Sequence, residues 1–167
     1  MAAAICLHPL ASVLFTHESS DDVMPYAMSY YWLSLRSKLE EIPRLRHCIA
    51  TIARIEGYSD VFIADFELSV HEAFVNALIH GNRGNASLPV TMTLEAGVAG
   101  GERFLEVSIR DCGEGFEPVR ALRSICSGWS EKASGGRGLF LVSQFAESFR
   151  IEKVVGGCVV VLRYIPY

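Results

Sequence analysis

Two pairs of strand-like segments, each folded back across glycines, do most to limit what this chain can fold into. In both pairs apolar and polar side chains alternate, which is typical of half-buried strands. Segments joined by a glycine turn pair as antiparallel hairpins. The predicted strands span residues 90–94 and 104–110 around a turn at Gly97–Gly101, and residues 151–155 and 158–165 around Gly156-Gly157.

Helical periodicity precedes the first hairpin. Apolar residues recur at three- and four-residue steps from Pro43 to Gly57, and a second helix is predicted from Ser59 or Asp60 to about His80. Aromatic residues at 30–35 predict a strand before them, and a short helix is predicted at 137–147. The fold expected is an α/β (α+β) two-layer sandwich, with a mixed, largely antiparallel sheet and its helices on one face.

Composition limits the class of protein. The chain has 167 residues, room for one ordinary domain, which we place at residues 29–167 behind an N-terminal arm at residues 1–28. A net charge of −4 argues against a nucleic-acid backbone binder. Five scattered cysteines without a CxxC pair favour a reducing compartment, and no apolar run is long enough for a membrane helix. A cytoplasmic protein without membrane or direct nucleic-acid contacts is expected.

Glu72 and Asn76 stand four residues apart on one face of the second predicted helix, among apolar neighbours. Polar groups near a core need partners, and a hydrated Mg²⁺ ion is one such partner. On this pair alone the alternative stays open that Glu72 is merely solvated and Asn76 bonds a neighbouring turn.

Two glycine-rich motifs follow. Asp111-Cys112-Gly113-Glu114-Gly115 comes directly after the 104–110 strand, where an Asp can accept a hydrogen bond from an exocyclic amine. Gly135-Gly136-Arg137-Gly138 leads into an apolar helix, whose N-terminus suits phosphates. Taken singly, the first motif is equally a plain strand-to-loop turn and the second a glycine hinge.

Together and in this order, these three motifs resemble the nucleotide-binding boxes of the GHKL (Bergerat-fold, histidine-kinase-like) ATPase superfamily. Within it, the chain is most similar to the bacterial anti-sigma-factor serine kinases. The resemblance covers about Tyr30 to Ile165. The matching boxes are residues 67–82, residues 110–116 and residues 135–142.

The resemblance implies roles for individual residues. Glu72 would be the general base for a serine hydroxyl, and Asn76 would hold Mg²⁺ on the phosphates of ATP or ADP. Asp111 would bond the adenine amino group. Arg46 is a looser match to an arginine near the partner and the γ-phosphate. The further nucleotide-binding positions implied are Gly113, Gly115, Lys132, Gly135, Gly136, Arg137 and Gly138, with residues 117–134 forming a lid.

The expected function is therefore an ATP-dependent serine/threonine-protein kinase. By resemblance, it phosphorylates an anti-anti-sigma partner of the STAS type, sequesters a sigma factor or similar regulator, and pairs as a homodimer. Two alternatives stay open: a binding module that uses nucleotide only as a clamp, and a detached histidine-kinase catalytic domain. His71, beside Glu72, invites the latter, but the chain has no room upstream for a phosphoacceptor hairpin.

Overall fold

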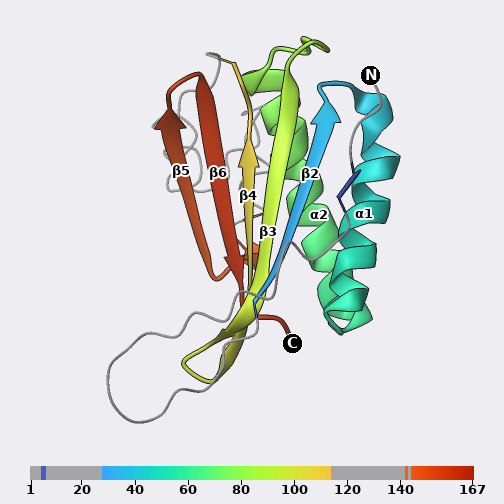
Figure 1. Ribbon diagram of the computed structural model, residues 1–167, viewed down its shortest axis with the longest axis vertical. Helices are drawn as coiled ribbons and strands as arrows, with labels where there is room; N and C mark the ends of the chain where they lie inside the picture. Colours follow the sequence, from blue (N-terminus) through green and yellow to red (C-terminus); the bar gives the residue numbers. More distant parts are fainter. Residues whose placement is uncertain (1–4, 7–27, 114–141, 143) are drawn as a thin grey trace, which may run out of the picture.

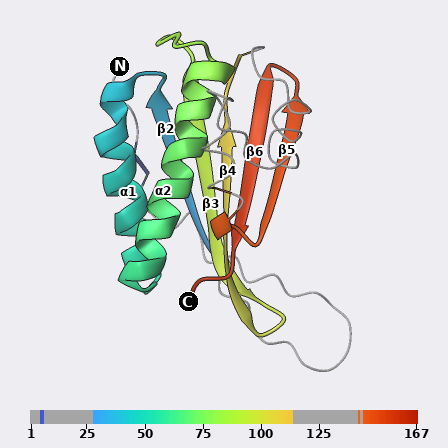
Figure 2. The ribbon, with the colours of Figure 1, turned by 180° about the vertical axis from the view of Figure 1, so that it is seen from behind.

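The computed structural model describes residues 5–6, 28–113, 142 and 144–167. Its sheet has six strands in the order β1-β2-β3-β4-β6-β5, and two long helices lie on one face of it (Figures 1 and 2). The elements are β1 (Ile5–Cys6), β2 (Ser29–Arg36), η1 (Leu39–Glu41), α1 (Ile42–Ile55), α2 (Asp60–Asn76), η2 (Ala77–Gly81), β3 (Pro89–Ala99), β4 (Glu102–Arg110), β5 (Ser148–Val154) and β6 (Gly157–Tyr164).

This architecture confirms the predicted two-layer sandwich. Every pair of neighbouring strands in the described chain is antiparallel, so the mixed character allowed for in the prediction does not appear there. Strand β1 was not predicted. It pairs with the edge of β2 from within the segment that was expected to be an arm, and two residues are too short a run to leave a periodic signal.

The first hairpin is longer than its alternation suggested. Ala99 pairs with Glu102, so the turn consists of Gly100 and Gly101 alone. Both glycines have positive φ, 62° and 85°, as a two-residue hairpin turn of type I′ requires. The predicted turn at Gly97–Gly101 was too wide because the small residues before it hide the last part of β3.

The second hairpin has the predicted strands but a turn shifted by one residue. Val154 pairs with Gly157, which places the turn at Val155-Gly156 rather than at Gly156-Gly157. Of the predicted helix at 137–147, the described residues Val142, Gln144 and Phe145 are helical, whereas Ala146 and Glu147 are not.

Both long helices begin where the sequence predicts. Pro43 lies in the first turn of α1, where its missing N–H costs nothing. Ser59 caps α2 by accepting a hydrogen bond from the backbone N–H of Phe62 at 3.1 Å. The second helix reaches Gly81, close to its predicted end, but its last five residues form the wider π-helical turn η2. None of the helices in the described residues is long and apolar enough to cross a membrane.

The core fills the space between the sheet and the two helices. Phe66 of α2 is fully buried, and its ring packs edge to face on that of Tyr164 at 5.4 Å. The inner face of the sheet contributes alternate residues from each strand, as the pleat requires. The buried side chains on the inner face include Tyr31, Leu33, Leu35, Val90, Met92, Leu94, Leu105, Val107, Ile109, Val160 and Leu162.

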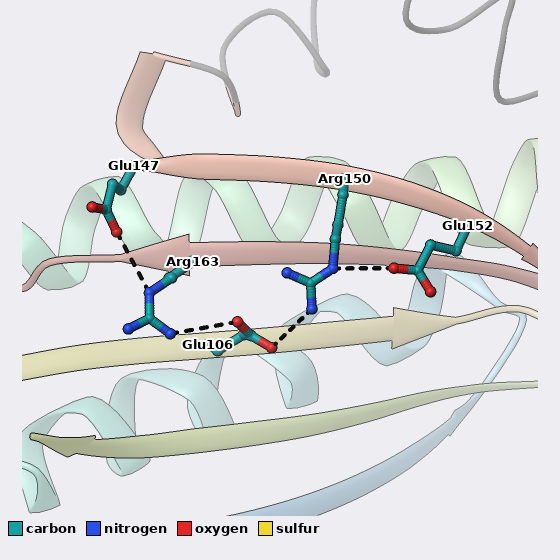
Figure 3. Close-up of polar contacts among 5 residues, drawn as sticks. All are labelled: Glu106, Glu147, Arg150, Glu152 and Arg163. Atoms are coloured by element: carbon teal, nitrogen blue, oxygen red, sulfur yellow. Dashed lines mark hydrogen bonds and ion pairs between the residues drawn. The ribbon is translucent and has the colours of Figure 1, made fainter. Parts of the chain in front are cut away.

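The outer face of the sheet carries a chain of ion pairs (Figure 3). Glu106 on β4 pairs with Arg150 at 3.3 Å and with Arg163 at 3.7 Å. Arg150 also contacts Glu152, and Arg163 also contacts Glu147. Such exposed pairs contribute little to stability, so this network marks the face that the helices leave to water.

Glu95 faces Glu106 across β3 and β4, which makes them a like-charged cross-strand pair. Burial and then the Glu106 charge raise the pKa of Glu95. A raised folded-state pKa means that ionised Glu95 disfavours folding at neutral pH and that this cost disappears as pH falls through that pKa.

Replacing Glu95 by Gln is therefore expected to stabilise the protein at pH 7, within the ~0.2–1 kcal/mol typical of cross-strand pairs. The gain should vanish at pH 3.5, where Glu95 is protonated in both states. Urea unfolding at the two pH values measures it, with Glu102→Gln at the exposed hairpin tip as control. An equal gain at both pH values would contradict the electrostatic cause.

Candidate functional site

Three segments meet at one end of the sheet: the end of η2, the residues that follow β4, and the start of β6. The backbone N–H of Asp111 donates to the carbonyl of Cys158 at 3.0 Å, which extends the β4–β6 pairing by one residue. Gly113 lies against Gly81, since a Cβ added to Gly113 would come within 1.9 Å of the Gly81 carbonyl oxygen. The first and second predicted boxes are therefore in contact.

Asp111 is the buried acid of this junction, with 3% of its surface exposed. Its Oδ1 accepts hydrogen bonds from the backbone N–H groups of Gly113 at 3.0 Å and Cys158 at 3.2 Å. Burial raises the pKa of Asp111, although these two bonds and Arg110 act in the opposite direction. The hydrogen bonds found between described residues engage Oδ1, whereas Oδ2 faces Gly81.

Gly81 shapes the space beside that carboxylate. A Cβ at this position would lie 2.4 Å from both Cγ and Oδ2 of Asp111, well inside contact distance. Only glycine lets the end of the helix approach the acid so closely. Residue 81 was part of the first predicted box but received no role of its own, because a contact with a residue thirty positions away leaves no local signal.

Asn82 holds the same junction together and was not predicted as a site residue. Its Nδ2 donates to Ser37 Oγ at 2.7 Å and to the Pro89 carbonyl at 3.0 Å, while its Oδ1 accepts from the Cys112 N–H at 2.8 Å. With 2% of its surface exposed, it joins the ends of β2, β3 and β4 to the end of η2. Its place as the last residue of the first box was the only sequence signal.

Asn76 is the last residue of α2, and its side chain has an unusual environment. Its Nδ2 atom is buried and has no hydrogen-bond partner. A flip of the amide exchanges this nitrogen with Oδ1, a suitable oxygen ligand for Mg²⁺. The alternative that Asn76 bonds a neighbouring turn gains no support from this atom. In the described part of the chain no three His, Cys, Asp or Glu side chains gather as a metal site, and the role of Asn76 as a Mg²⁺ ligand stays a prediction.

Glu72 lies one turn before Asn76 on α2 and is half-buried. It takes part in none of the ion pairs found between described residues. His71 beside it is also half-buried. Glu72 lies on α2, and its catalytic role stays a prediction.

Arg46 is placed less favourably for its predicted role. It lies on α1 with 58% of its side chain exposed and forms an ion pair with Glu67 of α2 at 3.1 Å. No described hydrogen bond or ion pair joins it to Glu72. Its role near a γ-phosphate stays a prediction too.

The remaining predicted positions lie outside the described residues. These are the lid at 117–134 and the residues Gly115, Lys132, Gly135, Gly136, Arg137 and Gly138.

A family comparison agrees with this arrangement. The sequence model of the histidine kinase-like ATPase domain matches residues 35–164, most of the chain. The chain belongs to this family, as the three boxes predicted. The division into an arm at 1–28 and a domain at 29–167 stays a prediction.

The chain is also similar to individual proteins. The chain is 26% identical over 151 residues to the serine-protein kinase RsbW of Oceanobacillus iheyensis, covering 81% of this chain and 87% of that protein. Among solved structures, the RsbU and RsbW domains of Rv1364c from Mycobacterium tuberculosis match with a TM-score of 0.57 at 17% identity. That match covers 82% of this chain but 32% of the larger one, and it supports the fold.

Proposed function

We propose that this protein is an ATP-dependent serine/threonine-protein kinase of the anti-sigma-factor type. Its substrate is an anti-anti-sigma protein of the STAS type, and its second partner is a sigma factor or similar regulator that it sequesters in the cytoplasm as a homodimer. The observation that carries the proposal is Glu72. A carboxylate one turn before the metal-binding candidate Asn76 serves a reaction, whereas a module that only binds nucleotide has no use for a base.

The nucleotide would be held by residues of the junction. Asp111 Oδ2 would accept a hydrogen bond from the adenine amino group, at the junction where Gly81 and Gly113 let the first and second boxes approach each other closely. Asn76 would supply an oxygen to the Mg²⁺ ion, which neutralises phosphate charge when bound.

The proposed chemistry is a single displacement. The carboxylate of Glu72 takes the proton of the partner's serine hydroxyl as that oxygen forms a bond to the γ-phosphorus. The bond from the γ-phosphorus to the β,γ-bridging oxygen breaks, and ADP leaves with the bonding electrons.

Glu72→Gln tests this role with minimal change of shape. We expect ADP affinity within twofold of wild type and a loss of serine phosphorylation of about 10²–10⁴-fold, the usual contribution of a general base. Intact-mass measurement of a purified STAS-type partner incubated with Mg-ATP reports the transfer. Glu152→Gln on β5 is the matched control, because Glu152 is exposed on the outer face of the sheet.

Each other outcome has a distinct meaning. Tight nucleotide binding by wild type with no phosphate on the partner would overturn the kinase and leave the nucleotide-gated binding module. Phosphohistidine on the partner would favour the detached histidine-kinase domain. Full activity of Glu72→Gln would remove the base from the mechanism.

A further inference from the structure

Several apolar side chains are exposed on the side of α2 and η2 that faces away from the sheet, next to charged residues such as Asp65 and Glu72. Val61 is 66% and Leu68 38% exposed on one side of α2, and Ile79, on the π-helical turn η2 that continues the helix, is 46% exposed. Ala64 is exposed and Val75 half-buried on the same side. We call these five residues the α2 stripe.

A surface helix normally presents polar residues to water. The buried side of α2 is already occupied by its contacts with the core, for example through Phe66 and Val70. No helix or strand of the described chain lies over the opposite side of α2 (Figure 2). The neighbouring helix α1 exposes Arg46, His47 and Arg54 along its length, and its exposed large apolar residue, Ile55, is its last residue. A row of exposed apolar side chains on a surface helix is typical of a site of protein association.

The position of Glu72 identifies what covers the stripe. Glu72 lies within it, one turn after Leu68 and just before Val75. A hydroxyl that gives its proton to Glu72 must come within about 3 Å of the carboxylate. The protein that carries this hydroxyl cannot reach it without covering apolar side chains one turn away in both directions.

The stripe is also long enough for a folded partner. At 1.5 Å per residue, the distance from Val61 to Ile79 is about 27 Å, comparable to the width of a small domain. A flexible serine peptide would need only the few residues around Glu72. The extent of the stripe therefore fits a folded protein with an apolar patch of its own.

We propose that the α2 stripe is the docking surface of the protein substrate, a folded protein whose acceptor serine borders an apolar patch. The inference rests on the proposed kinase function, since it uses Glu72 as the base. It assigns substrate recognition to side chains that have no role in the proposed nucleotide and metal contacts.

The test compares Leu68→Asp with Val98→Asp. Val98 is a matched control, because it is also a partly exposed aliphatic residue, 41% against 38%, but lies on β3 near the hairpin tip. The probe is a purified STAS-type protein from the same organism. Titration calorimetry with Mg-ADP present measures its binding, intact mass measures its phosphorylation, and ADP affinity reports that each variant is folded. Leu68→Lys repeats the test with the opposite charge.

We expect both Leu68 variants to lose at least tenfold in partner affinity and in phosphorylation while ADP affinity changes less than twofold. Val98→Asp should match wild type. Wild-type affinity in both Leu68 variants would overturn the docking surface. So would a wild-type dimer that becomes monomeric in Leu68→Asp on sedimentation, because the stripe would then belong to a second copy of this chain. Partner binding that is lost in Leu68→Asp, without phosphorylation by wild type, would support the docking surface and overturn only the kinase function.

Discussion

Asn in place of Asp111 should weaken ADP binding about 10- to 100-fold without unfolding the protein. Asn retains an oxygen to accept from the Gly113 and Cys158 N–H groups but presents an NH₂ group where Oδ2 would accept from adenine. The variant loses a hydrogen bond to a charged group and places two hydrogen-bond donors opposite each other. Together these changes cost about 1.5–3 kcal/mol of binding free energy. Titration calorimetry with ADP measures the change.

The pKa of Asp111 predicts the stability of the same variant. Burial raises this pKa, so the ionised acid disfavours folding at neutral pH, and the cost decreases as pH falls. Removing the charge should leave the nucleotide-free melting temperature at pH 7 equal to that of wild type or above it. Asp60→Asn, at the exposed start of α2, is the control for binding. Unchanged ADP affinity in Asp111→Asn would show that adenine is bound elsewhere.

Replacing Gly113 by Ala should cost about 3 kcal/mol or more of unfolding free energy, at or beyond the upper end for overpacked sites. The new methyl group would lie 1.9 Å from the Gly81 carbonyl oxygen, and the backbone there cannot rotate away as a side chain could. Urea unfolding of the nucleotide-free protein measures the loss.

Gly57→Ala is the matched comparison. Gly57 has a φ of +73° and open space around its would-be Cβ, so alanine there costs only backbone strain, about 1 kcal/mol. Gly113 has no such positive φ, so the cost of alanine at this position comes from steric overlap with the Gly81 carbonyl oxygen. If the two variants lose equal stability, the close approach of the boxes does not hold.

Local patterns in the sequence predicted most of the fold. The strand at 30–35 and the start of each helix followed from periodicity and capping residues within a few positions of one another. Hairpin turns were less accurate, because Gly97 and Gly157 read as turn residues yet lie in strands β3 and β6. Glycine marks a turn only where a positive φ or a tight reversal is actually needed.

The sequence predicted the site residues through their motifs, but it could not show which of them contact one another in the fold. Asp111 could be chosen because it follows a strand and precedes glycines. Asn82 could not, since its three partners are contributed by Ser37, Pro89 and Cys112, which are far apart in the chain and come together only in the folded sheet. The α2 stripe was hidden for a similar reason: apolar residues occur on more than one side of this helix, and which of them stay exposed depends on how the helix packs.

The wide turn η2 gives the end of the first box one residue that its geometry does not need. A π-helical turn contains one residue more than an α-helical turn, and the residues before and after it keep their places on either side of the extra one. Deleting one residue between Ala77 and Gly81 is therefore expected to turn η2 into an ordinary α-helical turn while leaving Asn82 near Cys112 and Gly81 near Asp111. Related chains that keep this junction should include some with one residue fewer between Glu72 and Asn82.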